Sequence, residues 1–145
     1  MSRIKVEPPK KISSVRLEEP PSILERVAVS YAHVTTNKAY SYACFGKSGW
    51  KDELLARRSE SDLLREITGA SWKAMILGRK EDFGGSETIP KKRIVFQPVG
   101  LVMSEDEKVY VLRFGAGMKY RLLGVRRENV LCVIGYDFNY SAYDH

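Results

Sequence analysis

The chain has few of the residues that build disulfide, metal or cofactor sites. It contains two cysteines and two histidines among 145 residues. A disulfide framework or a zinc site needs more thiols, or paired histidines at ligand spacing, and neither pattern occurs here. Cys44 and Cys132 each lie in an apolar run, so we expect both to be buried free thiols. The sequence therefore predicts no metal and no cofactor.

Long apolar runs are also missing. No stretch approaches the ~20 apolar residues that a membrane-spanning helix needs. The first residues are charged and interrupted by proline, unlike a signal peptide. The sequence therefore predicts no contact with a membrane and a cytoplasmic location.

Positive charge is in excess. Lysine and arginine number 24 against 18 aspartate and glutamate, which gives a net charge of +6. Such a balance favours an anionic partner, and RNA is the partner we expect. The competing interpretation is a soluble domain that happens to be basic.

Composition divides the chain into two parts. Residues 1–22 are charged and carry two Pro-Pro pairs, which predicts a flexible or extended tail. Residues 23–145 have a size typical of one domain. The pattern of apolar residues in this part predicts an α+β fold, with a central helical segment packed on a mostly antiparallel sheet.

The first half of the predicted domain begins with strands. Apolar residues alternate over 26–33 and recur in AYSYACF after a TTNK turn, which predicts a hairpin over 26–45. Helical spacing follows from Trp50, a second helix is predicted between a Ser59 cap and Gly69, and a third over 71–78.

Strands return in the second half. Residues 79–92 are predicted to be a loop, and RIVFQPVGLV is predicted to be a bent or edge strand because Pro98 lacks an N–H. Three short runs rich in Val, Tyr and Leu then follow, split by short turns. They predict an antiparallel meander over Lys108–Phe114, Tyr120–Val125 and Val130–Tyr136.

Two arginines lie inside these last strands. If the strands pair in simple register, Arg113, Lys119 and Arg121 meet at one end of the sheet, where they could hold a phosphate. The alternative is a set of structural ion pairs, because the two arrangements look alike in a sequence. The acidic partners would then be Glu105, Asp106, Glu107 and Asp137.

Other residues could contact a nucleic acid. The segment after the last strand is rich in tyrosine, and Tyr140 and Tyr143 could stack on bases or transfer protons. His33 lies among small apolar residues and is expected to be structural. The candidates for a basic, nucleic-acid-binding surface are Arg57, Arg58, Lys91, Lys92, Arg93, Lys119, Arg126 and Arg127.

Residues 93–145 resemble the RelE/ParE-like toxin superfamily. The resemblance rests on three stretches, VLRFG, KYRLLG and VLCVIGYDF, followed by the tail NYSAYDH. It implies cleavage of mRNA, with Arg113 and Arg121 holding the phosphate and Tyr140 or Tyr143 assisting proton transfer or stacking. The sequence departs from the family at Gly135-Tyr136-Asp137, where members often carry Gly-His-Arg. The central helical segment also resembles small proteins of phages and mobile elements.

The expected function is a small metal-independent endoribonuclease of toxin–antitoxin or phage-defence type, with a cognate antitoxin or other protein as a possible partner. The alternative is a non-catalytic module that binds nucleic acid or protein, such as a phage-encoded inhibitor. The two differ in a measurable way, since only the first degrades RNA.

Overall fold

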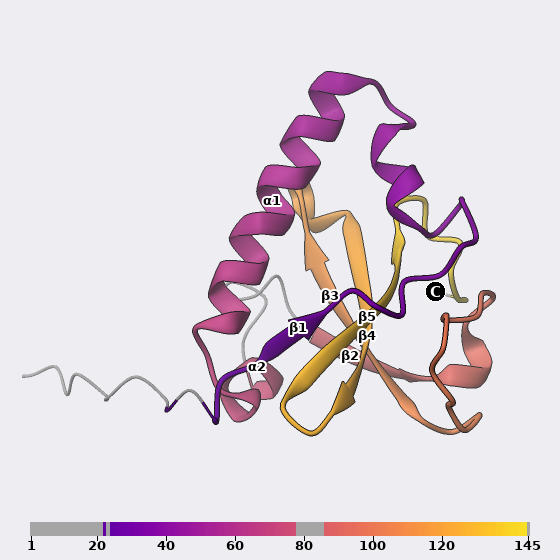
Figure 1. The fold of residues 1–145 in the computed structure, drawn as a ribbon. Helices are drawn as coiled ribbons and strands as arrows, with labels where there is room; N and C mark the ends of the chain where they lie inside the picture. Colours follow the sequence, from indigo (N-terminus) through magenta and orange to yellow (C-terminus); the bar gives the residue numbers. More distant parts are fainter. Residues whose placement is uncertain (1–21, 23, 78–85, 145) are drawn as a thin grey trace, which may run out of the picture.

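The computed structural model describes residues 22, 24–77 and 86–144, so the predicted tail over 1–22 lies almost entirely outside the described residues. Within these ranges a five-stranded sheet packs against helices (Figure 1), which confirms the predicted α+β class. The elements are, in chain order, β1 (Ala28–Ser30), η1 (Tyr42–Gly46), α1 (Trp50–Thr68), α2 (Trp72–Leu77), β2 (Ser86–Pro90), η2 (Lys91–Arg93), β3 (Lys108–Phe114), η3 (Ala116–Met118), β4 (Tyr120–Arg127) and β5 (Val130–Asp137).

The sheet has the strand order β1-β5-β4-β3-β2. Strands β2 to β5 pair antiparallel, and β1 is added parallel to β5 at the edge. The predicted meander is confirmed as β3, β4 and β5. Its strands are joined by short turns, which fixes which residues face each other across the sheet.

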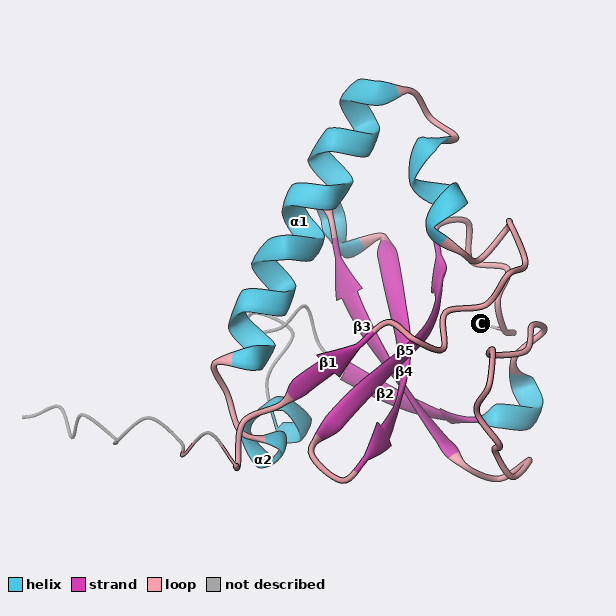
Figure 2. Ribbon diagram, in the orientation of Figure 1, coloured by secondary structure: helices cyan, strands magenta, loops and turns pink. Residues whose placement is uncertain are grey.

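Both faces of the sheet are buried. On the helix face, α1 and η1 pack against the sheet (Figure 2), and Phe45 and Ile67 meet Leu122. On the other face, which we call the loop face, Phe96 and Tyr143 cover strand residues such as Val111, Leu123 and Ile134. Strand residues therefore alternate between two separate apolar clusters.

A β-bulge in β5 determines which face of the sheet the last residues of the strand lie on. Leu123 lies opposite Gly135, whereas Gly124 lies opposite Val133, so Ile134 is the extra residue. The extra residue reverses the alternation after it. Tyr136 therefore joins the helix-face cluster, and the next residue, Asp137, is turned toward the loop face.

The predicted hairpin over 26–45 is wrong. Only Ala28–Ser30 forms a strand, which pairs with β5, and Tyr42–Gly46 is a 3₁₀ helix. Between them, local side-chain bonds replace the strand ladder, as polar side chains often do in turns. The backbone N–H groups two residues further along donate to the side-chain oxygens of Thr35, Asn37 and Ser41.

The strand predicted over 93–102 is also wrong, although its alternation is real. Ile94 and Phe96 are buried in the loop-face cluster, while Val95 is exposed. This segment joins no ladder, because its amides bond elsewhere: Val95 N donates to Ala142 O and Val99 N to His33 O. The strand at the β3 edge of the sheet is instead β2, within the stretch predicted to be a loop.

The predicted helix boundaries are partly right. Gly69 ends α1 as expected, and α2 starts at Trp72, inside the predicted third helix, whose last residue lies outside the described ranges. Ser59 does not cap a second helix, since α1 runs through it without a break. Residues such as Ala56 and Leu63 lie on the buried side of this single helix.

Candidate functional site at the end of the sheet

A row of charged residues crosses one end of the sheet on the loop face. Arg113 and Arg121 are direct cross-strand partners, and Arg121 is in turn the partner of Asp137. On the far side, Glu87 of β2 lies within ion-pair distance of Arg113, with 3.9 Å between its Oε1 and the arginine Nη2. Two like charges directly opposite repel each other, and the two flanking carboxylates offset that repulsion.

Both predicted tyrosines join the two arginines. The Tyr143 hydroxyl donates a hydrogen bond of 2.7 Å to Glu87 Oε1. The guanidinium of Arg121 lies 4.7 Å from the centre of the Tyr140 ring, a cation–π geometry. We call Glu87, Arg113, Arg121, Tyr140 and Tyr143 the arginine cluster. All four residues predicted to be catalytic are therefore close together.

Hydrogen bonds to the carboxylate of Asp137 hold the segment that carries both tyrosines against the sheet. It is buried and accepts backbone hydrogen bonds from Asn139, Ser141 and Ala142, at 3.3, 3.1 and 3.2 Å. Such a turn around an aspartate reverses the chain. It places Tyr140 and Tyr143 above the ends of β3 and β4 rather than in a free tail.

Members of the arginine cluster differ in exposure. Arg121 is only 7% exposed; its Nη1 donates to Lys119 O at 3.0 Å, while its buried Nε finds no hydrogen-bond partner in the described part of the chain. The side chain of Glu87 is 40% exposed and that of Arg113 is 26% exposed. An incoming group therefore reaches Glu87 and Arg113 first.

Tyr143 is held in its protonated form. Burial raises its pKa to about 12, and the hydrogen bond to Glu87 acts in the same direction, while the positive charge of Arg121 opposes it. At neutral pH the hydroxyl is therefore a hydrogen-bond donor and a proton source. The carboxylate of Glu87 is the group of this cluster that can accept a proton.

Known proteins offer no guide to this site. Searches against protein-family models, curated proteins and solved structures found no match. The site is therefore interpreted on its own geometry.

Most of the other predicted cations lie apart from the arginine cluster, in ion pairs or on aromatic rings. Three of the four predicted acidic partners of the sheet-end arginines bind different cations: Glu105 pairs with Lys91, Asp106 with Lys92 and Glu107 with Arg127. The fourth, Asp137, lies opposite Arg121 as predicted. Arg57 pairs with Glu53 and lies over Phe45, Arg93 donates to Asp144 O, Arg126 covers Trp72, and Arg58 is exposed on α1. Each of the cations named here except Arg58 therefore contacts another group of the protein.

Two further expectations concern histidine and metals. His33 Nδ1 lies 2.7 Å from the carbonyl oxygen of Val99, a structural contact far along the chain from the arginine cluster. In the ranges that the structure describes, no three His, Cys, Asp or Glu side chains are grouped to hold a metal ion. The helices in those ranges are also too short or too polar to cross a bilayer.

A second group of titratable residues lies on the helix face and was not predicted. Glu60 of α1 faces Tyr136 and lies near Tyr31 and Tyr42. Neither Glu60 Oε2 nor the Tyr136 hydroxyl makes a hydrogen bond of ordinary geometry within the described residues. Burial raises the pKa of Glu60, and neighbouring Tyr136 and Arg57 only partly oppose that effect.

Glu60→Gln is therefore expected to stabilise the protein at neutral pH by about 1 kcal/mol, because it removes a poorly solvated negative charge. In the wild type the folded state binds this proton more tightly than the unfolded state does. Its free energy of unfolding should thus fall as pH rises from about 4.5 through the raised pKa. Urea unfolding between pH 4 and 8 measures both effects. Glu66→Gln, on the exposed side of the same helix, should show neither, and equal curves for Glu60→Gln and wild type would contradict the assignment.

Proposed function

We propose that this protein is a small metal-independent endoribonuclease of toxin type that acts on RNA in the cytoplasm. The observation that supports this proposal is the meeting of Arg113, Arg121, Tyr140 and Tyr143 with a partly exposed carboxylate, Glu87. Two guanidinium groups beside an acid–base pair are the parts that RNA cleavage by internal attack requires.

In the proposed reaction, Glu87 accepts the proton of a ribose 2′-hydroxyl. The 2′-oxygen then attacks the adjacent phosphorus, and the bond from phosphorus to the 5′-oxygen breaks, which leaves a 2′,3′-cyclic phosphate. Tyr143 gives its proton to the departing 5′-oxygen and recovers one from Glu87 through their 2.7 Å hydrogen bond. No other reactant is consumed.

The arginines stabilise the phosphate as negative charge develops on its oxygens. Arg113 is the more exposed of the two and would contact the phosphate directly. Tyr140 is half exposed, so one part of its ring can stack on a base while Arg121 lies against it.

The test is cleavage of a mixed-sequence single-stranded RNA by the full chain in the presence of EDTA. We expect cleavage to persist in EDTA and to fall about 100-fold in Arg121→Ala, the usual cost of losing one oxyanion donor. Arg113→Gln provides a second variant, because Arg121 is buried and its removal can affect folding. Arg58→Ala, which removes an exposed arginine on α1, is the matched control.

The alternative is a non-catalytic module that binds nucleic acid or a protein partner such as an antitoxin. The deep burial of Arg121 and its contact with Tyr140 favour this alternative, since both restrict access to the guanidinium. It predicts RNA binding that weakens with salt and no turnover by wild type. That outcome would replace the nuclease proposal.

A further inference from the structure

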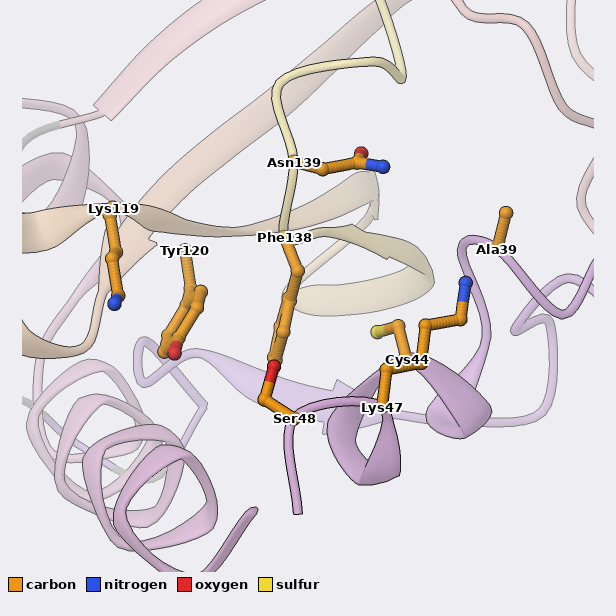
Figure 3. A pocket seen from close by; sticks show the side chains of 8 residues that line it. All are labelled: Ala39, Cys44, Lys47, Ser48, Lys119, Tyr120, Phe138 and Asn139. Atoms are coloured by element: carbon orange, nitrogen blue, oxygen red, sulfur yellow. The ribbon is translucent and has the colours of Figure 1, made fainter. Parts of the chain in front are cut away.

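A pocket lies on the opposite face of the sheet from the arginine cluster. It has a volume of about 220 Å³ and opens between η1 and the end of the β3–β4 hairpin (Figure 3). Tyr120 lines this pocket, while its neighbour Arg121 belongs to the arginine cluster, because consecutive strand residues face opposite sides. In the segment after β5, Asn139 likewise lines the pocket while Tyr140 contacts Arg121.

Two stacked rings form the middle of the pocket. Tyr120 and Phe138 have ring centres 4.1 Å apart and planes within 19° of parallel. The Phe45 ring packs against Phe138 with ring centres 4.8 Å apart and planes at 60°. Gly115 leaves space for the Tyr120 ring, since a Cβ at that position would lie 2.3 Å from the ring and its φ of +84° already favours glycine. The ring pair is thus held in place before any ligand binds.

Positive charge lies on both sides of the ring pair. Figure 3 shows Lys119 beyond Tyr120, and Lys47 with Cys44 on the other side of Phe138. Neither lysine forms an ion pair with the described residues, and no acidic side chain lines the pocket. Burial raises the pKa of the Cys44 thiol to about 12, so the thiol adds no negative charge. Lys119 Nζ lies 5.1 Å from the centre of the Tyr120 ring. The pocket is therefore aromatic and cationic, with no carboxylate in its lining.

Polar groups complete the lining. Ser48 and Asn139 add a hydroxyl and a carboxamide to the lining. The Asn139 Oδ1 already accepts a hydrogen bond from Ser141 Oγ, so this carboxamide offers a ligand its N–H donors. The volume is below the ~300–1,000 Å³ of sites for drug-sized ligands. It suits one planar ring, with charged groups of the ligand at the open rim where the two lysines are exposed.

We propose that this pocket binds one nucleotide unit of a single-stranded nucleic acid. The base would extend the Tyr120–Phe138 stack on the side of Phe138 that faces Cys44 and Lys47, which is how proteins commonly hold unpaired bases. Lys47 would contact the phosphate of that nucleotide, and Lys119, across the ring pair, the phosphate of its neighbour. This inference goes beyond the proposed cleavage and does not depend on it.

The test is calorimetric titration of the full chain with three probes: dAMP, the 5′-phosphorylated deoxydinucleotide of adenine, and inorganic phosphate. Deoxyribose lacks the 2′-hydroxyl, so no cleavage can occur and the result is independent of nuclease activity. We expect dAMP to bind more tightly than phosphate and the dinucleotide more tightly than dAMP. Equal affinity for dAMP and phosphate, or no saturable binding of either nucleotide, would overturn the proposal.

The same titrations with three variants show which residue contacts which part of the nucleotide. Lys47→Ala should weaken binding of both nucleotides about tenfold, the cost of one charge-assisted contact. Lys119→Ala should weaken only the dinucleotide, and Phe138→Leu should weaken both nucleotides but not phosphate. Lys108→Ala removes an exposed lysine at the other end of β3 and is the control. Wild-type affinities in Lys47→Ala and Phe138→Leu together would place the ligand elsewhere and overturn the pocket assignment.

Discussion

Replacing Glu87 by glutamine is expected to reduce the rate of the proposed RNA cleavage at least about 100-fold, the usual contribution of a general base. The amide keeps the size of the carboxylate and can still accept a hydrogen bond from Tyr143, but it does not take up a proton at neutral pH. The measurement is the single-turnover rate on a defined single-stranded RNA with EDTA present.

The control separates loss of the base from loss of charge. Glu128→Gln removes one negative charge from the exposed turn between β4 and β5 and should cleave at the wild-type rate. RNA affinity of Glu87→Gln should rise or stay constant, because a carboxylate beside the phosphate site repels the substrate. A Glu87→Gln protein that cleaves like wild type would remove Glu87 from the mechanism.

Phe45→Ala is expected to lower the free energy of unfolding by about 3–5 kcal/mol, the range for removing a fully buried phenylalanine. The ring is buried at the centre of an aromatic group, with ring centres 4.9 Å from Tyr136, 4.8 Å from Phe138 and 6.3 Å from Phe114. The guanidinium of Arg57 lies over its outer side at 4.8 Å. Truncation leaves a cavity between η1, α1 and the sheet.

Urea unfolding followed by circular dichroism measures this loss. Tyr42→Ala, in the same 3₁₀ helix but 41% exposed, should cost much less. Phe45→Leu should fall between the two, because it keeps most of the buried apolar volume. A loss below about 1 kcal/mol for Phe45→Ala would show that η1 does not hold the helix face together.

The last three strands could be predicted because their pattern is local. Alternating apolar residues separated by short turns fix both the strands and their pairing, and the pairing of Arg113 with Arg121 follows from the turn length. The proximity of the two arginines was therefore accessible to sequence reasoning. The resemblance to a toxin superfamily stays a prediction, since nothing in the structure tests it directly.

The predictions that were wrong or incomplete concern features that the local pattern of apolar residues does not determine. Residues 94–96 alternate like a strand, yet their burial comes from packing under the segment around Ala142, a contact between distant parts of the chain. Glu87 was missed because its strand lies in a polar stretch with two neighbouring glycines, a composition that predicts a loop. The turn around Asp137 that positions the tyrosines depends on a bulge at Ile134, and the sequence carries no clear local signal for it.

The parallel pairing of β1 with β5 has a consequence for the order of folding. The two partners are separated by about a hundred residues, so closing this edge costs more chain entropy than any antiparallel pairing in the sheet. During synthesis, Ala28–Ser30 leaves the ribosome well before its partner β5 exists, and the apolar side of α1 leaves before β3, β4 and β5, which complete its cluster. The apolar surface of this early part of the chain is therefore expected to favour aggregation until the later strands emerge.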